Sequence, residues 1–240
     1  MRGVVFDIES VFAHFRKIYT NSSSLSYSVP PRTTIHGILA AVLGYERDSY
    51  YSLMDSSLHV SVKKNNPTYK MTHTLNYIRA ESAGDLVKAK KHTQIPLEVI
   101  SSAPNVSYKV YAAADKFSDM EMLIKRLKNN RYVFPPTLGT AFFLADISNV
   151  SEAIFYEQDY CDFMEVSSII NADAVEEIKI KEMALLKEKM PRAFGKERTI
   201  KSMASYYVED TGGTITTKLK KGYPCWKVNY MKNEEFVVFM

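Results

Sequence analysis

Apolar and polar residues alternate in several short runs of the chain, and this pattern is typical of half-buried β-strands. In the run from 3 to 9, Phe6 and Ile8 share one face, and Asp7 and Glu9 share the other. A strand places successive side chains on opposite faces of its sheet, so one face of this run is expected to be buried. The same period predicts three further strands, over residues 57–63, 106–113 and 141–147.

A helical period follows the first predicted strand. Four apolar residues share one helix face, because they are spaced by three or four positions: Ile35, Ile38, Leu39 and Val42. Either Thr33 or Thr34 is expected to be the N-cap, and Gly44 the C′ residue. The spacing therefore predicts an amphipathic helix that begins near residue 34 and ends near 43.

A second helix is predicted between the last two strands. Its apolar stripe consists of Met120, Leu123, Ile124 and Leu127. Ser118 and Glu121 have the spacing of a capping box, and Asn129 and Asn130 mark the end.

The order of these elements is β-α-β, a long insertion over 64–95 without a sustained period, and again β-α-β. Two split βαβ units predict an α+β, ferredoxin-like fold over residues 1–150, which is also the topology of RNA-recognition (RRM-like) domains. The aromatic-rich RNP1 pattern is absent, so base stacking on the sheet face is not expected. Short strand-like runs separated by turn residues predict a small antiparallel β domain over 151–240.

Composition places the chain among globular proteins. Hydrophobic residues make up 46% and charged residues 24%, which argues against disorder. No apolar run is long enough to span a bilayer, and no signal peptide is recognisable. Cys161 and Cys225 form neither a disulfide framework nor a metal motif. We therefore expect a cytoplasmic protein without a membrane partner, a cofactor or a metal.

Charge is unevenly distributed. Residues 61–95 contain seven Lys or Arg and two acids, whereas residues 151–177 contain eight acids and no Lys or Arg. Two interpretations remain open: these are two solvated faces, or a polyanion binds the first segment and avoids the second.

Three stretches offer phosphate- or base-binding chemistry. The Ser-rich loop before the first helix leads to a helix N-terminus, whose free N–H groups and dipole favour phosphate, although its hydroxyls could serve only as caps. The basic insertion interleaves Tyr69, His73, Tyr77 and His92 with Lys and Arg, as in nucleic-acid binding, although a solvated loop has the same composition. Gly139, after Pro135 and Pro136, could allow a ligand backbone to approach closely, although a plain turn would also explain it.

A catalytic alternative rests on Tyr45, Lys91 and His92. Histidine could act as a general acid or base, and lysine could stabilise the charged phosphorane of a metal-independent ribonuclease. His92 could equally be a loop histidine that contacts phosphate or water.

Four runs of the chain together resemble a known family: "AHFRKIYTNSSSLSYSVPPRTTIHGILAAVLGYERDSYY", "TQIPLEVI", "NNRYVFPPTLGTAFFLADI" and "KEKMPRAF". The chain is similar to the Cas five family of CRISPR-associated proteins, in the variety found in type I-B Cascade, an antiviral ribonucleoprotein complex. The resemblance implies a ferredoxin-like domain with an inserted thumb, which matches residues 64–95, and a small β domain. It implies binding of the crRNA 5′ handle and contacts with the Cas seven backbone subunit and the Cas eight large subunit. Target DNA would be reached indirectly, through the complex.

The resemblance also implies site residues. We expect the loop and helix N-terminus to cradle RNA through Arg16, Lys17, Ser23, Arg32, Thr33 and Thr34, and the thumb to bind it through His73, Arg79, Lys90, Lys91 and His92, with Gly139 beside the RNA backbone. Arg32→Ala is accordingly expected to weaken RNA binding and to leave the melting temperature nearly unchanged. In type I-C relatives the Cas five protein itself cuts the repeat, so a repeat-cleaving endoribonuclease is the alternative to a non-catalytic handle-binding subunit. A purely structural subunit is a third possibility.

Overall fold

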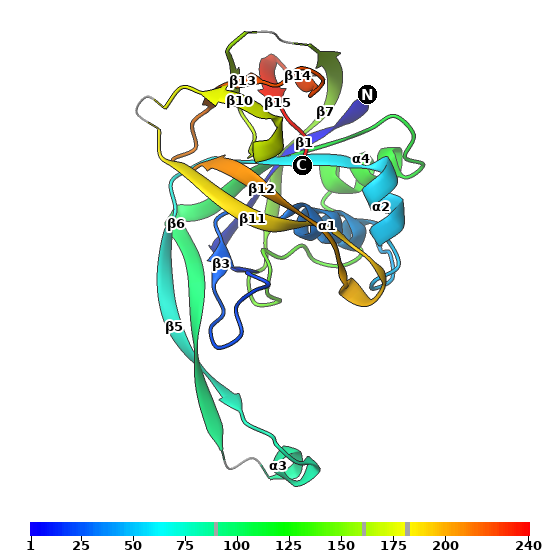
Figure 1. Ribbon diagram of the computed structural model, residues 1–240. Coiled ribbons are helices and arrows are strands. Elements are labelled where there is room, and N and C mark those ends of the chain that lie inside the picture. The colour runs from blue at the N-terminus through cyan, green and yellow to red at the C-terminus, as the bar shows by residue number, and fades with distance from the viewer. Residues whose placement is uncertain (89–90, 160–161, 181–182) are drawn as a thin grey trace.

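The protein consists of a body built around one large sheet and a long two-stranded arm that projects from it (Figure 1). A computed structural model describes residues 1–88, 91–159, 162–180 and 183–240. Its helices are α1 (Arg32–Leu43), α2 (Tyr51–Ser57), α3 (Ala83–Val87) and α4 (Met120–Lys128). Its strands are β1 (Arg2–Ala13), β2 (Phe15–Arg16), β3 (Ser26–Tyr27), β4 (His59–Lys64), β5 (Tyr69–Ile78), β6 (His92–Ala114), β7 (Asp146–Gln158), β8 (Met164–Val166), β9 (Ile170–Asn171), β10 (Val175–Ile178), β11 (Leu185–Phe194), β12 (Ile200–Glu209), β13 (Ile215–Leu219), β14 (Cys225–Tyr230) and β15 (Asn233–Val237).

The main sheet has the order β15-β14-β7-β1-β6-β4, with β5 paired to β6 beyond the body. Every pairing in this sheet is antiparallel. Both α1 and α4 pack on the sheet, and the main core lies between them and β1, β4 and β6. The structure is therefore a mixed α and β fold dominated by antiparallel strands, as the alternating runs indicate.

The two predicted helices are present, but their N-terminal caps differ from the prediction. The predicted apolar stripes of α1 and α4 are buried in the core, and Gly44 ends α1 in the left-handed conformation at φ 78°. However, α1 begins at Arg32 directly after Pro31, and no side chain caps it. The N-cap of α4 is Asp119, also without a side-chain bond, so the capping box predicted at Ser118 and Glu121 is wrong.

The strand predicted over 141–147 is also misplaced. β7 begins at Asp146, and the apolar residues before it lie in a loop in which Phe142 is 89% exposed. Ser10 Oγ donates a 2.8 Å hydrogen bond to the Leu144 carbonyl, which holds this loop against β1. Residues 141–144 therefore lie in a loop outside the sheet, whereas Ala145 and Ile147 are buried and Ile147 belongs to β7.

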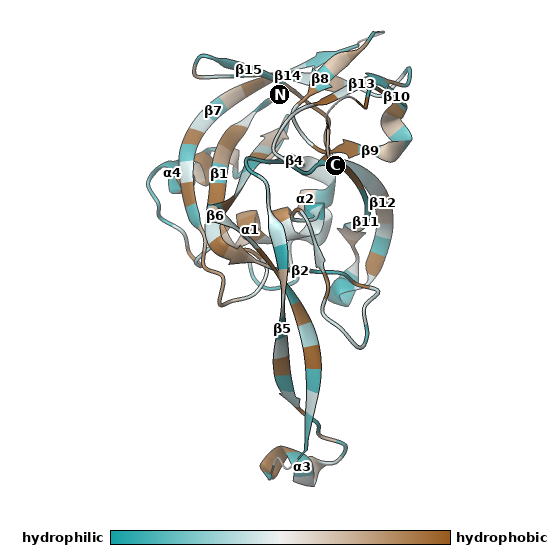
Figure 2. Ribbon diagram, turned by 90° about the vertical axis from the view of Figure 1, so that its left-hand side faces the viewer, coloured by the Kyte–Doolittle hydropathy of each residue, from teal (hydrophilic) through white to brown (hydrophobic). Residues whose placement is uncertain are grey.

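Residues 64–95 are more regular than the sequence indicates. β5 pairs with the first part of β6 from Tyr69 opposite Ser101 to Ile78 opposite His92, and α3 lies at the far end. We call residues 69–101 the arm. Most side chains of β5 are exposed, and Figure 2 shows apolar and polar residues interspersed along the arm. A ribbon exposed on both faces has no core side, which explains the missing period.

The C-terminal residues do not form one separate sheet. The division predicted at residue 150 falls inside β7, and both β14 and β15 extend the main sheet. The remaining strands form two small sheets, β10-β13-β8 and β11-β12-β9. The second of these packs through β11 against α1 and α2, which brings it to the candidate site described below. Within the described ranges, none of the helices combines the length and apolarity that crossing a membrane would require.

Candidate nucleic-acid interface

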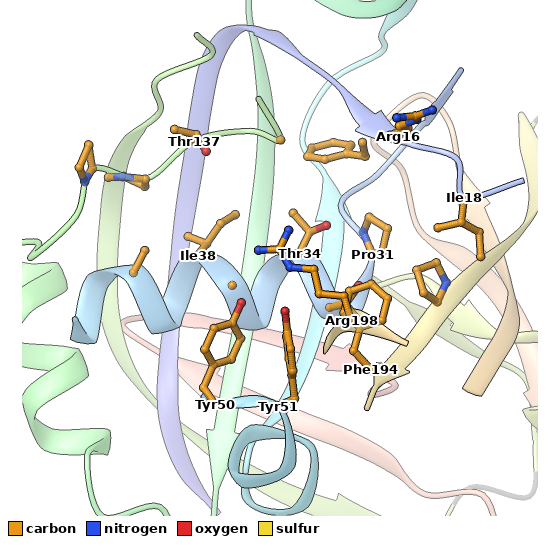
Figure 3. A pocket seen from close by; sticks show the side chains of 18 residues that line it. Arg16, Ile18, Pro31, Thr34, Ile38, Tyr50, Tyr51, Thr137, Phe194 and Arg198 are labelled. Carbon is orange, nitrogen blue, oxygen red and sulfur yellow. The ribbon is translucent and has the colours of Figure 1, made fainter. Parts of the chain in front are cut away.

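A hollow of about 350 Å³ opens at the N-terminus of α1 (Figure 3). Five parts of the chain line it: β2, the first turns of α1, the start of α2, the loop at 135–139, and the segment from the end of β11 to Arg198. We call it the first hollow. Figure 3 shows Tyr50 and Tyr51 below α1, with Thr34 and Arg198 beside its N-terminal end.

The first turn of α1 gives this hollow a positive character. No acid occupies the turn and no side chain caps it, while Thr33 and Thr34 line the hollow. An uncapped helix N-terminus presents backbone N–H groups and the positive end of the helix dipole. Arg16, which is exposed, adds a full positive charge; its Nη2 donates only a long 3.4 Å bond to the Thr20 carbonyl. The arrangement suits an anion such as a phosphate group.

Arg198 is a second cation of the first hollow, and the sequence did not single it out. Its side chain is 53% exposed, and its Nε donates a 2.8 Å hydrogen bond to Asp48 Oδ1. Tyr51 Oη donates to the same oxygen at 2.5 Å. These hydrogen bonds, from Tyr51 first and from Arg198, hold the pKa of Asp48 below its usual range. No pattern in the sequence links the turn after β11 with α2, so only the fold reveals this residue.

A second hollow of about 760 Å³ lies between the body and the β5–β6 ribbon of the arm. It shares Phe15, Arg16, Thr34 and Gly139 with the first hollow. We call the two hollows together the groove. His73 and Tyr77 enter the groove from β5, and Phe142 enters it from the loop before β7. The groove thus connects a cationic helix N-terminus to a set of exposed aromatic side chains.

The Ser-rich loop before α1 anchors the arm to the body. Ser24 N donates to the Pro96 carbonyl at 2.8 Å, and Glu98 N donates to the Ser24 carbonyl at 2.9 Å. Ser26 N donates to Glu98 Oε2 at 2.8 Å. His14 also bridges the two parts, because its ring lies 2.7 Å from the Glu98 carbonyl and 3.0 Å from Ser24 Oγ. Much of the polar capacity of this loop is therefore used inside the protein.

Arg32 is buried, although the sequence predicts that it contacts RNA. Its side chain is 3% exposed, and Nη1 lies 2.5 Å from Asp55 Oδ1. Its other bonds go to three backbone carbonyls, those of Asp55, Leu58 and Arg192. A guanidinium with four internal acceptors holds α1 to α2 and β11, so its role in this structure is architectural.

Two further predicted residues lie outside the groove, and one of them is engaged by the protein. Lys17 lies 3.3 Å from Glu188 and faces the ring of Tyr27, and it does not line either hollow. Ser23 is half-buried in the loop and, among the described residues, is not part of the groove either.

Gly139 lines both hollows, but the reason for its glycine differs from the prediction. Its φ is +101°, and a Cβ atom would lie 1.7 Å from the carbonyl oxygen of His14. His14 N also donates to the neighbouring Leu138 carbonyl at 3.0 Å. The close approach is therefore to the backbone of this protein, and it permits the floor of the groove to form.

The chain is identified by a family comparison. A family model described as CRISPR-associated protein (Cas_Cas5) matches residues 3–152. This chain belongs to the Cas five family. No curated protein matches it.

Two solved structures share the fold of this Cas five chain. A CRISPR protein from Archaeoglobus fulgidus is 14% identical, with a TM-score of 0.63 over 100% of this chain and 99% of that one. A chain of a CRISPR RNA-guided surveillance complex is 12% identical, with a TM-score of 0.52 over 90% of this chain and 91% of that one. At these identities the similarity concerns the fold.

The far end of the arm carries the remaining predicted residues. Arg79 lies 2.6 Å from Glu81, and Lys91 lies 3.9 Å from the same carboxylate. Extended strand of roughly 30 Å separates His92 from Ser101, at the body. Lys90 lies outside the described residues.

Tyr45 is remote from the arm. It follows α1 directly and donates its hydroxyl proton to Asp119 at the start of α4, and burial together with Asp119 raises its pKa to about 12. The structure therefore does not bring Tyr45, Lys91 and His92 together in one chain. Within the described residues, no group of His, Cys, Asp and Glu side chains is arranged to hold a metal ion.

Proposed function

We propose that this chain is a non-catalytic RNA-binding subunit of a type I CRISPR Cascade effector complex. It caps and recognises the crRNA 5′ handle and links the Cas seven backbone to the Cas eight large subunit in the cytoplasm. It reaches target DNA only through that complex. The observation that carries this proposal is the groove, in which the uncapped N-terminus of α1 and Arg16 meet the β5 side of the arm.

The first hollow suits the sugar-phosphate part of the handle. Arg16 can offer a planar fork of N–H donors to phosphate oxygens, and Thr33 and Thr34 offer hydroxyls beside it. Because the hollow is lined by five separate segments held by protein contacts, these donors are positioned before RNA arrives. Preorganised donors lower the ordering cost of binding.

The second hollow suits bases. Tyr77 is half-exposed, Phe142 is almost fully exposed, and both line it together with His73. Single-stranded RNA is commonly read by stacking of unpaired bases on such rings. The aromatics lie on the arm and on a loop, outside the part of the sheet that belongs to the body, where the missing RNP1 pattern gave no reason to expect base stacking.

The core supports the expected domain type. Four strands lie in the order β7-β1-β6-β4, and α1 and α4 connect them in the sequence β1-α1-β4-β6-α4-β7. We infer a ferredoxin-like unit from this order, with the arm as its insertion. The short α2 between α1 and β4 is an addition.

The non-catalytic assignment is supported by the chemistry of the groove. Its two histidines are His14 and His73. Burial lowers the pKa of His14, whose ring is already engaged by Ser24 and the Glu98 carbonyl. General acid–base cleavage needs groups that can exchange protons with the reacting atoms, and the separation of Tyr45 from His92 argues against the predicted set within one chain.

The test uses the purified full-length chain and its own repeat RNA. Fluorescence anisotropy should show binding to the handle sequence at least about tenfold tighter than to a scrambled RNA of equal length, which corresponds to ~1.4 kcal/mol. Incubation of the chain with the whole repeat, with and without EDTA, should leave the RNA intact. A specific cleavage product that forms in the presence of EDTA and is absent with His92→Ala would contradict this proposal and show that the chain is the endoribonuclease. Equal affinity for the handle sequence and the scrambled RNA would contradict specific recognition of the handle.

A further inference from the structure

A third hollow, of about 660 Å³, lies on the outer side of α4 and shares no residue with the groove. We call it the α4 hollow. It is lined by Met122, Lys125, Arg126, Asn129, Arg131, Tyr132 and Val133. Nothing in the proposed RNA-binding role uses this surface.

The two sides of α4 differ in how their charges are balanced. On one side, Glu152 accepts from Lys128 at 2.7 Å and from Arg2 at 2.9 Å. In the α4 hollow, by contrast, no carboxylate is present, and Lys125 and Arg131 have no acidic partner among the described residues. The hollow thus carries unbalanced positive charge beside a side of α4 that the protein neutralises itself.

Helix electrostatics explains only part of this charge. Cations in a last helical turn are stabilised by the helix dipole, which accounts for Lys125 and Arg126. Arg126 also donates a 2.8 Å hydrogen bond to the Val42 carbonyl at the end of α1. Arg131, however, lies beyond the helix, and the dipole gives no reason for the exposed apolar residues next to it.

Those apolar residues are held in place. Met122 is 50% exposed and Val133 is 48% exposed. Val133 N donates to the Val42 carbonyl at 3.4 Å, and Phe134 N donates to the Ala41 carbonyl at 3.1 Å. A Cβ on Gly44 would lie only 2.7 Å from Val133. The apolar centre of the α4 hollow is therefore preformed by contacts with the end of α1.

The combination of cations and exposed apolar side chains in the α4 hollow favours a protein over a nucleic acid as its ligand. Met, Tyr and Arg are the side chains enriched in the centres of protein interfaces, and Met122, Tyr132, Arg126 and Arg131 line this hollow. A phosphate backbone would make no use of Met122 and Val133. An acidic segment with an apolar side chain satisfies both the cations and the apolar centre.

We propose that the α4 hollow docks an acidic segment of a protein partner, which places an apolar side chain over Met122 and Val133 and carboxylates beside Lys125 and Arg131. The choice of candidate partners rests on the proposed function, because they are the other protein subunits of the effector complex. The RNA groove and this docking surface are separate, so each can be tested without the other.

The first experiment is site-specific photo-crosslinking in the assembled complex. A benzophenone amino acid replaces Met122, or in the matched control replaces Met231, an exposed methionine of the turn between β14 and β15. The chain is co-expressed with the other subunits of its operon and with crRNA. We expect position 122, and not position 231, to crosslink to one protein subunit, within a segment that has at least two acids beside an apolar residue. Crosslinking to nucleic acid, to a second copy of this chain, or to nothing would overturn the proposal.

The second experiment reverses charge. Lys125→Glu combined with Arg131→Glu should weaken retention of that subunit at least about tenfold, because two attractive contacts become repulsive. The control variant, Lys189→Glu combined with Lys232→Glu, makes the same charge change on exposed lysines outside the α4 hollow. This control should retain the crosslinked subunit as well as the wild-type chain does. Both variants should keep the wild-type melting temperature and handle affinity. Full retention of the crosslinked subunit by the first variant would overturn the proposed docking surface. Failure of the wild-type chain to bind the handle would overturn only the proposed function.

Discussion

Arg16 and Arg32 lie near the same helix N-terminus and have opposite surroundings. Arg16 is exposed at the point where the two hollows of the groove meet, with one long hydrogen bond to a carbonyl. Arg32, on the inner side of the first turn of α1, is enclosed with Asp55 and three backbone carbonyls. Charge type alone therefore does not distinguish a ligand-binding residue from an architectural one. The two arginines differ in their access to solvent.

The surroundings of Arg32 also carry an energetic cost. Arg32 Nε, His36 Nε2 and Tyr206 Oη are buried without a partner among the described residues. Burial, and then the charge of Arg32, lowers the pKa of His36 to about 3, so this ring is neutral at physiological pH. A buried ion pair surrounded by unpaired polar atoms is sensitive to the loss of either member.

The strongest test of the comparison is Arg32→Ala. Removing a buried partner typically costs about 3–5 kcal/mol, and we expect about 2–4 kcal/mol here because Asp55 is 19% exposed and keeps Lys201 at 3.3 Å. Urea unfolding measures the change. The double variant Arg32→Met/Asp55→Leu should recover part of the loss, since no charge is left unpaired. An unchanged free energy of unfolding in Arg32→Ala would contradict the architectural role and restore the sequence-based expectation.

The pH dependence of the same variant sharpens the test. Although burial raises the pKa of Asp55, the hydrogen bond and charge of Arg32 more than offset this, so the folded-state pKa lies below the unfolded value of about 3.9. A lowered folded pKa gives stabilisation that is complete above the unfolded pKa and is lost as pH falls through the folded one. The stability gap between wild type and Arg32→Ala should therefore be widest above about pH 4 and should narrow below it. A gap that widens on acidification would contradict this account.

Arg16→Ala should show the opposite behaviour. Loss of one charge-assisted contact should reduce handle affinity about tenfold, or ~1.4 kcal/mol, with the melting temperature nearly unchanged. The slope of log affinity against log salt should become shallower by about 0.7, the value for one phosphate on a single strand. Lys232→Ala serves as the control, because Lys232 is exposed outside the groove. A lower melting temperature with wild-type handle affinity would show that Arg16, like Arg32, has an architectural role.

Asp48→Asn tests a smaller effect within the groove. Asp48 holds Arg198 with a 2.8 Å hydrogen bond, and under the proposed function it would compete with RNA for that cation. Asparagine retains an acceptor for Tyr51 but removes the charge, so handle affinity should rise about threefold, or ~0.7 kcal/mol. The gain should disappear in the double variant with Arg198→Ala. A gain that persists without Arg198 would exclude this residue from the groove.

The smallest effect is expected at the tip of the arm. Lys91→Ala should reduce handle affinity about twofold at most, because Lys91 is exposed and shares Glu81 with Arg79. Anisotropy at several salt concentrations would show a slope shallower by about 0.7 if Lys91 meets one phosphate. An unchanged slope in Lys91→Ala would remove this lysine from the RNA path.

The sequence predicted best those elements that have one buried face. The alternation around Phe6 and the stripe from Ile35 to Val42 locate β1 and α1, because a face buried against the core leaves a period in the sequence. The arm has no core face, so the periodicity of apolar residues predicted no strand there. The loop at Phe142 carries exposed apolar residues, so the same periodicity predicted a strand where the structure has a loop. β14 joins the main sheet by pairing with β7, and β15 pairs with β14; no local pattern encodes either pairing.

The candidate site divides in the same way. The sequence by itself determined that polar and cationic residues precede α1 and that aromatics accompany the basic insertion, because both are local properties of the chain. Only the tertiary structure decided which of them face the groove: it enclosed Arg32 with Asp55, engaged Lys17 with Glu188, and brought Arg198 beside Thr34 from the other end of the sequence. The physical reason is that solvent access and ion pairing depend on contacts between segments distant in the chain. A local pattern specifies which groups are available, and packing determines which of them remain free for a ligand.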